Sequence, residues 1–351
     1  GVPRHAVELT RAQILAHRRS VGALTDRLAS GPDSLRAAAW AGLQDSMPRA
    51  ALLSIHARVA ATPPEALDDP ALAQVWGPRF SNFVVARADV PVFTLGRFPD
   101  DARGRRVAVE TADRLEAFLA GRRMGYGDAG AAMGVNANSL RYATTTGRVL
   151  MRWEGARQPI VWAVPPPTMT PEAARLELAR RYLHVFGPAT AAGFAKWAGI
   201  GSGESSAAIA GLLPNLVAAR TPIGDAWILA ADEASFRQAA TNEAGGSRTA
   251  NVVRLLPSGD AYALLWGAAR ELLVPDPARR SELWTSRVWP GAFLVDGEVA
   301  GTWRRDQARV SIEAWRRLTA AEQEAVESEV ASLPLPNLPV RPFVAALTAP
   351  E

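Results

Sequence analysis

Apolar and polar positions in the middle of the chain follow a repeating order of elements. Apolar residues recur at helical spacing through 111–123, and two glycines then interrupt the pattern. A short helix is expected over 128–134, and a third helix over 135–148. Residues 149–164 alternate about a Glu-Gly turn, which predicts a β-hairpin. This order of elements is typical of a winged helix-turn-helix motif.

The same order occurs a second time, about 60 residues further along the chain. Thr170 and Pro171 suit the N-cap and the first position of a helix that continues to residue 186. A short helix is expected over 187–199, a third helix over 201–216 and a hairpin over 217–230. An internal repeat of this kind predicts two tandem winged helices.

The regions on either side of the repeat have different patterns. Residues 10–28, 34–43 and 48–60 read as helices and precede an apolar, strand-like stretch, as in a diverged third copy. The C-terminal region is strand-rich, and Thr319 with Glu322 predicts a capping box for a final helix. We therefore expect an α+β protein with tandem winged helices. Its expected units are 1–105, 106–168, 169–240 and 241–351.

The composition is that of an ordinary globular protein, with 48% hydrophobic and 21% charged residues. No apolar run approaches the roughly 18 residues of a membrane-spanning helix. The first residues have no apolar segment of a secretory signal, so a cytoplasmic location is expected. The net charge is +4, and Lys196 is the only lysine, so 38 of the 39 basic residues are arginine. A GC-rich genome explains this excess as well as phosphate recognition does.

Residue types that hold metals or cofactors are scarce. The chain has no cysteine, and its four histidines are scattered without an HxH or HExxH pattern, so no metal site is expected. Gly125 to Gly130 match GxGxxG, but they follow a helix and not the strand that a dinucleotide site requires. We therefore expect no cofactor.

Several arginines fall on the third helix and the hairpin of the first copy. Arg141 lies in the expected third helix, Arg148 at its end, and Arg152 and Arg157 in the hairpin. In a winged helix these elements contact phosphate groups, so the four residues are candidate DNA contacts. Arginine pairs are also common on solvated surfaces, and a winged-helix protein can be a transcriptional regulator.

Three consecutive polar residues, Gln44, Asp45 and Ser46, separate two apolar helical stretches. One explanation is local, because Pro48 suits the first turn of a helix and Ser46 or Asp45 could cap it. Capping does not explain Gln44, which is no better a cap than many residues. The alternative is a polar cluster, held by two packed helices, at which chemistry is done. The residue pattern alone leaves both explanations open.

Four blocks, in order, resemble the winged-helix DNA glycosylases related to the azinomycin-resistance glycosylase. GLQDSMPRAALL, beginning at Gly42, is similar to the family's GLQ-x-Q-x-PRAALL block, and GPATAAGFAKWAG to its GPAT…W-x-G segment. LLPSGDAYAL and DGEVAGTW resemble its C-terminal elements. The resemblance implies tandem winged helices around a concave face that binds double-stranded DNA. It also implies hydrolysis of the N-glycosidic bond of N7-alkylated guanine.

The resemblance assigns candidate catalytic residues, because the family's motif is Gln-x-Gln or Gln-x-Asp. By position Gln44 is the first member, Ser46 replaces the third, and Asp45 stands where the family has a small or apolar residue. Gln44 would then orient a water at C1′ of the sugar, with Ser46 as its partner. A carboxylate serves better as a base, so Asp45 is a further candidate if the backbone turns it inward.

The same resemblance sets expectations for the reaction and its substrate. A single lysine argues for a monofunctional glycosylase without lyase activity. Expected lesions are bulky natural-product adducts, as in antibiotic self-resistance, or simple N7-methylguanine. Ser46 also leaves open a protein that binds damaged DNA and releases no base. A monomer is expected.

Overall fold

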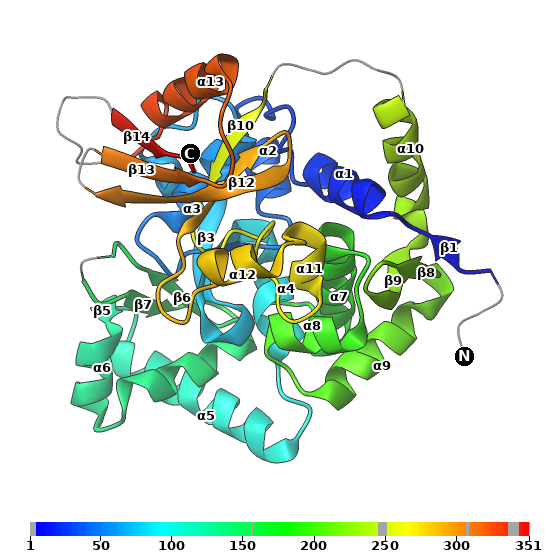
Figure 1. The fold of residues 1–351 in the computed structure, drawn as a ribbon. Helices are drawn as coiled ribbons and strands as arrows, with labels where there is room; N and C mark the ends of the chain where they lie inside the picture. Colours follow the sequence, from blue (N-terminus) through cyan, green and yellow to red (C-terminus); the bar gives the residue numbers. More distant parts are fainter. Residues whose placement is uncertain (1–4, 156, 245–250, 307–308, 336–343, 351) are drawn as a thin grey trace.

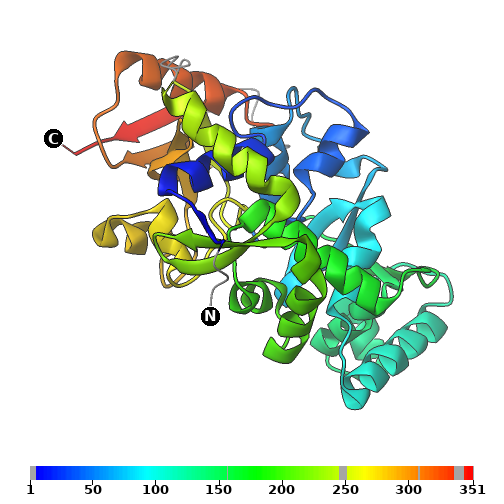
Figure 2. The same cartoon turned by 90° about the vertical axis from the view of Figure 1, so that its right-hand side faces the viewer.

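The computed structural model describes residues 5–155, 157–244, 251–306, 309–335 and 344–350, which form an α+β fold with three sheets. A sheet of C-terminal strands lies at one end of the molecule (Figures 1 and 2). Helices α5 (Ala102–Leu119) and α6 (Tyr126–Met133) lie at the opposite end. No helix in the described ranges is both long and apolar enough to cross a membrane.

A six-stranded sheet joins the N-terminal region to the first copy of the repeat. Its order is β2-β4-β3-β6-β7-β5, and the two parts meet where Gln74 pairs with Met151. Consecutive apolar residues of the central strands are buried, as in a strand that is covered on both faces. The strands are β2 (Leu43–Gln44), β3 (Leu72–Trp76), β4 (Asn82–Ala86), β5 (Met124–Gly125), β6 (Val149–Arg152) and β7 (Ile160–Ala163).

The first copy contains the predicted helix, short helix, third helix and hairpin, as α5, α6, η5 (Ala137–Thr146) and β6–β7. The third helix is a 3₁₀ helix. Its start is capped by Asn136, whose Oδ1 accepts the N–H of Asn138 at 2.9 Å. The short strand β5, between α5 and α6, pairs with β7 and closes the unit.

The second copy repeats this order. Thr170 caps its first helix, which begins at Pro171, as predicted. A bridge between Ala189 and Trp227 stands where β5 pairs with β7 in the first copy. The N-terminal strand β1 (Val7–Glu8) adds to the hairpin in parallel. The elements are α7 (Pro171–Phe186), α8 (Ala191–Ala198), α9 (Ser202–Leu212), β8 (Leu216–Thr221) and β9 (Gly224–Leu229).

Three N-terminal helices occupy the predicted stretches but are shorter than expected. They are α1 (Arg11–Val21), α2 (Pro32–Ala38) and α3 (Ala50–Arg58). The expectation that Pro48 begins a helix is wrong, because the chain turns at Pro48 and Arg49 and Arg49 has φ 66°. In the apolar stretch that follows, residues 82–86 form strand β4, and the residues after this strand are helical. The helical segments here are η1 (Ala66–Asp68), η2 (Pro78–Phe80), η3 (Arg87–Asp89), α4 (Val90–Thr94) and η4 (Leu95–Arg97).

The C-terminal region forms a five-stranded sheet in chain order, antiparallel except for the last pair. The capping box of Thr319 and Glu322 is confirmed at the start of α13 (Ala320–Ala331). The strands are β10 (Val253–Leu256), β11 (Gly291–Val295), β12 (Glu298–Asp306), β13 (Arg309–Ala314) and β14 (Val344–Thr348). The other helical segments are η6 (Leu213–Asn215), η7 (Ala230–Asp232), α10 (Glu233–Ala244), α11 (Ala269–Leu273) and α12 (Pro277–Leu283).

The hydrophobic core is shared between the expected units. One buried cluster includes Phe83, Leu178 and Trp284, which come from the first, third and fourth units. Helix α5 also spans the expected boundary between residues 105 and 106. The division into four units stays a prediction, and the shared cluster joins three of these units through buried contacts.

Candidate active site

Gln44 and Ser46 are brought together where β2 ends. Gln44 pairs with Phe83 at the edge of the six-stranded sheet, and the N–H of Asp45 donates to the carbonyl of Asn82 at 2.7 Å. This extended backbone directs alternate side chains to opposite sides. The Nε2 of Gln44 donates to the Oγ of Ser46 at 2.9 Å, and Ser46 is exposed. The two residues therefore form a polar pair that is open to solvent.

Asp45 points the other way, into the protein. Its side chain is 2% exposed, and its Oδ1 accepts the N–H of Ala51, in the first turn of α3, at 2.9 Å. The residue just before α3, Arg49, provides no side-chain cap. Burial raises the pKa of Asp45 to about 6, against the hydrogen bond from Ala51 and the charge of Arg49. Asp45 thus satisfies the start of α3, as the capping explanation requires, whereas Gln44 and Ser46 do not.

Gly259, in the turn after β10, forms one wall of the polar pair. A Cβ on this residue would stand 3.1 Å from Nε2 of Gln44 and 3.6 Å from Oγ of Ser46. The next residue, Asp260, is buried and is held by both terminal nitrogens of Arg58, at 2.7 and 2.8 Å. Burial favours the neutral acid, but the charge and hydrogen bonds of Arg58 hold the pKa of Asp260 below its ordinary value. This ion pair fixes the turn beside Gln44.

Pro48 connects the site to two further parts of the chain. Arg305, near the end of β12, donates to its carbonyl oxygen at 2.7 Å. Gly155, in the turn of the first hairpin, lies so close that a Cβ there would be 2.9 Å from the Cβ of Pro48. Burial, together with the charge of Arg49, lowers the pKa of Arg305. The loop after β2 is therefore flanked by the first hairpin and the C-terminal sheet.

The four arginines expected to contact DNA have different surroundings. Arg148 pairs with Asp113 at 2.7 Å and with Glu116 at 2.9 Å. Arg152 donates to the carbonyl of Leu67 at 3.0 Å, and it also pairs with two acidic side chains, Asp68 and Glu154. Arg141 is half-buried, with its guanidinium 5.9 Å from the ring centroid of Trp76, and Arg157 is exposed. Internal partners thus offset the charges of Arg148 and Arg152, and contact with DNA stays a prediction for all four.

Two residues near Gln44 were not identified from the sequence. Gly259 lies in a block that carries the family resemblance, but nothing in the residue pattern brings it to Gln44. Arg79, at the turn between β3 and β4, donates from Nη2 to the Oε1 of Gln44. Neither contact is visible in spacing or periodicity, because each depends on how distant segments pack.

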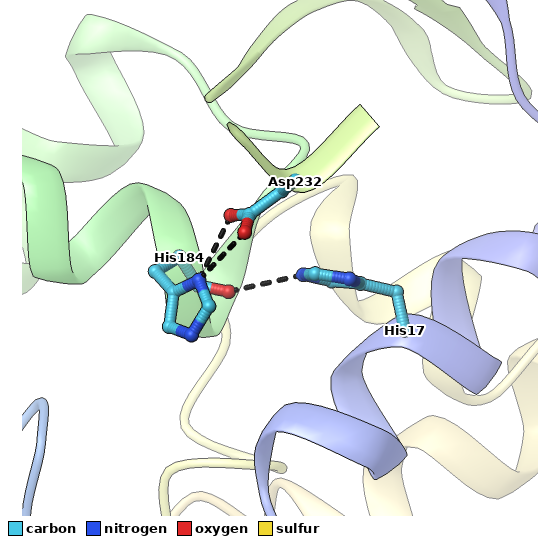
Figure 3. A group of neighbouring side chains, drawn as sticks. All are labelled: His17, His184 and Asp232. Atoms are coloured by element: carbon cyan, nitrogen blue, oxygen red, sulfur yellow. Dashed lines mark hydrogen bonds and ion pairs between the residues drawn. The ribbon is translucent and has the colours of Figure 1, made fainter. Parts of the chain in front are cut away.

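His17, His184 and Asp232 are, in the described ranges, the group whose side chains could hold a metal ion, with ligand atoms within 4.8 Å of one another. The histidines are scattered along the sequence, but the fold brings His17 and His184 close together. Figure 3 shows the carboxylate of Asp232 facing Nδ1 of His184, at 2.9 Å to both oxygens. The Nε2 of His17 faces the carbonyl oxygen of His184 at 3.2 Å, and its Nδ1 faces the hydroxyl of Ser235 at 2.7 Å.

These contacts occupy the atoms that would bind the ion. A carbonyl oxygen only accepts, so Nε2 of His17 carries the hydrogen and has no lone pair to offer. Burial lowers the pKa of His17, which keeps the ring neutral. The cluster links α1 to α7 and α10 through these hydrogen bonds and through the ring of His17, which stacks on Phe236 with centroids 3.8 Å apart, and it does not fit a metal in this arrangement.

The sequence from residue 37 to residue 334 matches the family model of the AlkZ-like DNA glycosylases, so the chain belongs to that family. Membership in this family makes the chain a DNA glycosylase, a class of enzyme that acts in DNA repair. The structure is similar to that of the DNA glycosylase AlkZ from Streptomyces sahachiroi. The TM-score is 0.71 at 16% identity, over 97% of this chain and 100% of that one. No curated protein matches the sequence.

Proposed function

We propose that this protein is a monofunctional DNA glycosylase that hydrolyses the N-glycosidic bond of N7-alkylated guanine. The observation that carries the proposal is the hydrogen-bonded pair of Gln44 and Ser46 at an open site. The pair corresponds to the first and third positions of the motif that the sequence resembles. Asp45, between them, is turned toward α3 and supports the loop.

The reaction needs little acid or base assistance. Alkylation at N7 makes guanine cationic, so the C1′–N9 bond breaks with its electron pair moving to N9, and a neutral base leaves. The sugar that remains has the character of an oxocarbenium ion, and the oxygen of a water molecule adds to C1′. A proton of that water then passes to solvent. The enzyme's part is to hold the water and stabilise positive charge, which neutral oxygen acceptors do without a buried base.

Gln44 and Ser46 offer the acceptors for this water. Each oxygen of the pair already takes part in one hydrogen bond, and each has a second lone pair. The carboxylates of Asp45 and Asp260 are committed to Ala51 and Arg58, so they act on the architecture of the site. Gln44 orients the water, and Ser46 assists.

DNA binding is assigned to the two copies of the repeat, as winged helices around a concave face. The first hairpin contacts the catalytic loop at Gly155 and Pro48, so duplex DNA bound along it would pass beside Gln44. Arg157, exposed on that hairpin, is the foremost phosphate contact. An open site suits bulky adducts that do not flip out of the duplex, as expected of a self-resistance enzyme. The protein acts as a monomer in the cytoplasm, bound to the nucleoid.

We expect no lyase activity, because that activity needs a nucleophilic amine and the chain has few amines to offer. A Schiff base requires an uncharged amine at C1′. The chain has a single lysine, Lys196, which is exposed on α8, so this side chain and the N-terminal amine are the only candidates. Hydrolysis of the glycosidic bond should therefore leave an intact abasic strand.

Base release tests the proposal directly. Duplexes carrying N7-methylguanine or a bulky N7-guanine adduct would be incubated with wild type and with Gln44→Ala, Ser46→Ala and Asp45→Asn under single-turnover conditions. We expect release by wild type, a collapse in Gln44→Ala, a smaller loss in Ser46→Ala and near-normal release by Asp45→Asn. Binding of the damaged duplex without release would instead identify a damage-binding protein. Tight binding of one undamaged sequence would identify a regulator.

A further inference from the structure

Arg79 makes an unusual contact with the Gln44 side chain. It lies at the tip of the turn between β3 and β4, in a left-handed conformation with φ 57°. From there its Nη2 donates to the Oε1 of Gln44, while its Nη1 donates to the carbonyl oxygen of Trp197. Its guanidinium carbon lies 4.9 Å from the ring centroid of Trp266. The guanidinium is therefore fixed on three sides, with one hydrogen bond directed at the catalytic amide.

The backbone of Arg79 is held by the end of α8. Gly199 follows that helix with φ +69°, and a Cβ on it would stand 2.9 Å from the Cα of Arg79. Such a close approach requires glycine. It brings the arginine side chain within reach of both the last carbonyls of α8 and the strand that carries Gln44. The second copy of the repeat thus contributes to the active site without supplying a catalytic residue.

The contact determines which end of the Gln44 amide faces which partner. A guanidinium has only donors, so it must meet the oxygen of the amide and not the nitrogen. The Nε2 group is then directed to Ser46, as observed at 2.9 Å. Burial lowers the pKa of Arg79 to about 10, which leaves it charged at neutral pH. A rotated amide would present N–H groups to Arg79 and is strongly disfavoured.

We propose that Arg79 is a positioning residue for the reaction, which locks the side-chain amide of Gln44 in one orientation. The inference rests on the proposed function, because it assigns Arg79 a role in presenting Gln44 to the water. Without Arg79 the amide rotates, and its oxygen no longer has a fixed place beside C1′. Arg79 acts through Gln44 and need not contact the DNA.

Arg97 is a matched control. Arg97 is buried, whereas Arg79 is half-buried. The guanidinium of Arg97 stacks on Phe80 at 4.4 Å, and it donates to the carbonyl of Ala198, the residue after Trp197, at 2.9 Å. Burial, with the charge of Arg79, lowers its pKa to about 9. Arg97 therefore shares the stacking on an aromatic ring and the link to α8, but it donates no hydrogen bond to Gln44. A purely structural role for Arg79 should give both arginines the same phenotype.

Single-turnover base release and duplex binding would be measured for wild type, Arg79→Met, Arg79→Lys and Arg97→Met. We expect Arg79→Met to lose about 10- to 100-fold in rate, since small misplacements of a catalytic group cost that much. Its affinity for the damaged duplex should change less than about threefold. Arg79→Lys should recover part of the rate. Arg97→Met should lower Tm and keep the rate of its folded fraction. Equal rate losses in both Met variants would overturn the inference.

A double-mutant cycle tests whether Arg79 works through Gln44. In the Gln44→Ala background, Arg79→Met should cause no further loss of rate, because the group that it positions is gone. Independent losses that multiply would show a separate role and would refute the positioning role.

A readout without catalysis separates this inference from the proposed function. The side-chain amide signals of Gln44, assigned in a ¹⁵N spectrum by their absence in Gln44→Ala, should shift and broaden in Arg79→Met and stay in place in Arg97→Met. Unchanged signals in Arg79→Met would overturn the positioning role even if wild type is active. A wild type that releases no base refutes the proposed function, while the spectrum still decides whether Arg79 holds the amide.

Discussion

Gly259 lies beside the side chain of Gln44, although the two residues are far apart in the chain. A Cβ on this glycine would stand 3.1 Å from Nε2 of Gln44. Gly259 also has φ +79°, a conformation that L side chains rarely adopt. The backbone conformation therefore favours glycine, and a Cβ would force the amide of Gln44 to shift by a few tenths of an ångström.

Gly259→Ala should reduce activity by displacing the amide of Gln44. The left-handed conformation alone costs about 1–2 kcal/mol of stability for a residue with a Cβ. Gly267→Ala is the control, because Gly267 has φ +56° but a Cβ on it would meet no atom within 4 Å. Both variants should lose stability in urea unfolding, and only Gly259→Ala should lose base release in its folded fraction. Equal rates of base release in the two variants would show that Gly259 does not shape the site around Gln44.

Asp45→Asn should stabilise the protein at neutral pH. The pKa of Asp45 is about 6 in the folded protein and about 3.8 when unfolded, so the folded state binds the proton more tightly. The proton on Asp45 stabilises the folded protein fully below pH 3.8, and this stabilisation is lost as the pH rises through 6. At pH 7 the buried charge costs about 3 kcal/mol, at about 1.4 kcal/mol for each pKa unit. The amide of Asn avoids this cost and still accepts the N–H of Ala51.

Urea unfolding of wild type and Asp45→Asn at pH 4.5 and pH 7.5 measures this effect. The variant should gain stability relative to wild type at the higher pH, and its rate of base release should stay close to normal. A collapse of the rate with stability intact would instead make Asp45 the group that handles the water.

His56 should make the protein sensitive to acid. Burial, and then the positive charges of Arg27 and Arg254, lower its pKa from 6.5 to about 3. A depressed histidine pKa gives stability that is present above pH 6.5 and is lost as the pH falls toward 3. From pH 6.5 to pH 5 the loss is about 2 kcal/mol. Glutamine is neutral at every pH. Between pH 7 and pH 5, the free energy of unfolding of His56→Gln, measured in urea, should therefore fall by about 2 kcal/mol less than that of wild type. Parallel losses in both proteins would contradict the assignment.

Arg157→Ala should weaken binding to damaged and undamaged duplexes about equally. Its side chain is exposed on the first hairpin, and a lost phosphate contact reduces the slope of log K against log salt by about 1. Arg148→Ala is the comparison, since Asp113 and Glu116 already pair with that arginine. It should leave the salt slope unchanged and cost less than about 1 kcal/mol of stability. An unchanged slope in Arg157→Ala, measured by fluorescence anisotropy, would place this hairpin outside the interface.

The order of elements in both copies could be predicted from the sequence because it depends on local pattern. Thr170 and Thr319 are caps whose partners lie three residues away, and periodicity identifies the helices that they begin. Strand β2 has only two residues, too few to show alternation. The joining of β3 to β6 in one sheet rests on a single pairing between Gln74 and Met151, which no local pattern records.

The candidate site was predicted in part. Family resemblance singled out Gln44, Asp45 and Ser46, but it could not separate the pair that faces solvent from the residue that caps α3. That separation depends on the direction of successive side chains at the end of a strand. Arg79 was missed for a related reason, since its contact with Gln44 is set by packing between distant segments.

The loop after β2 touches three parts of the chain that are far apart in sequence: Gly155, Gly259 and Arg305. No single copy of the repeat therefore contains all the residues that support the proposed site. A fragment ending at residue 240 would keep Gln44, Ser46 and Arg79 and still lack two of these supports. For protein engineering, this means that moving one copy of the repeat would not carry the proposed site with all of its supports. Recombination between relatives, aimed at altering lesion preference, should therefore take the loop and its three supports from the same parent sequence.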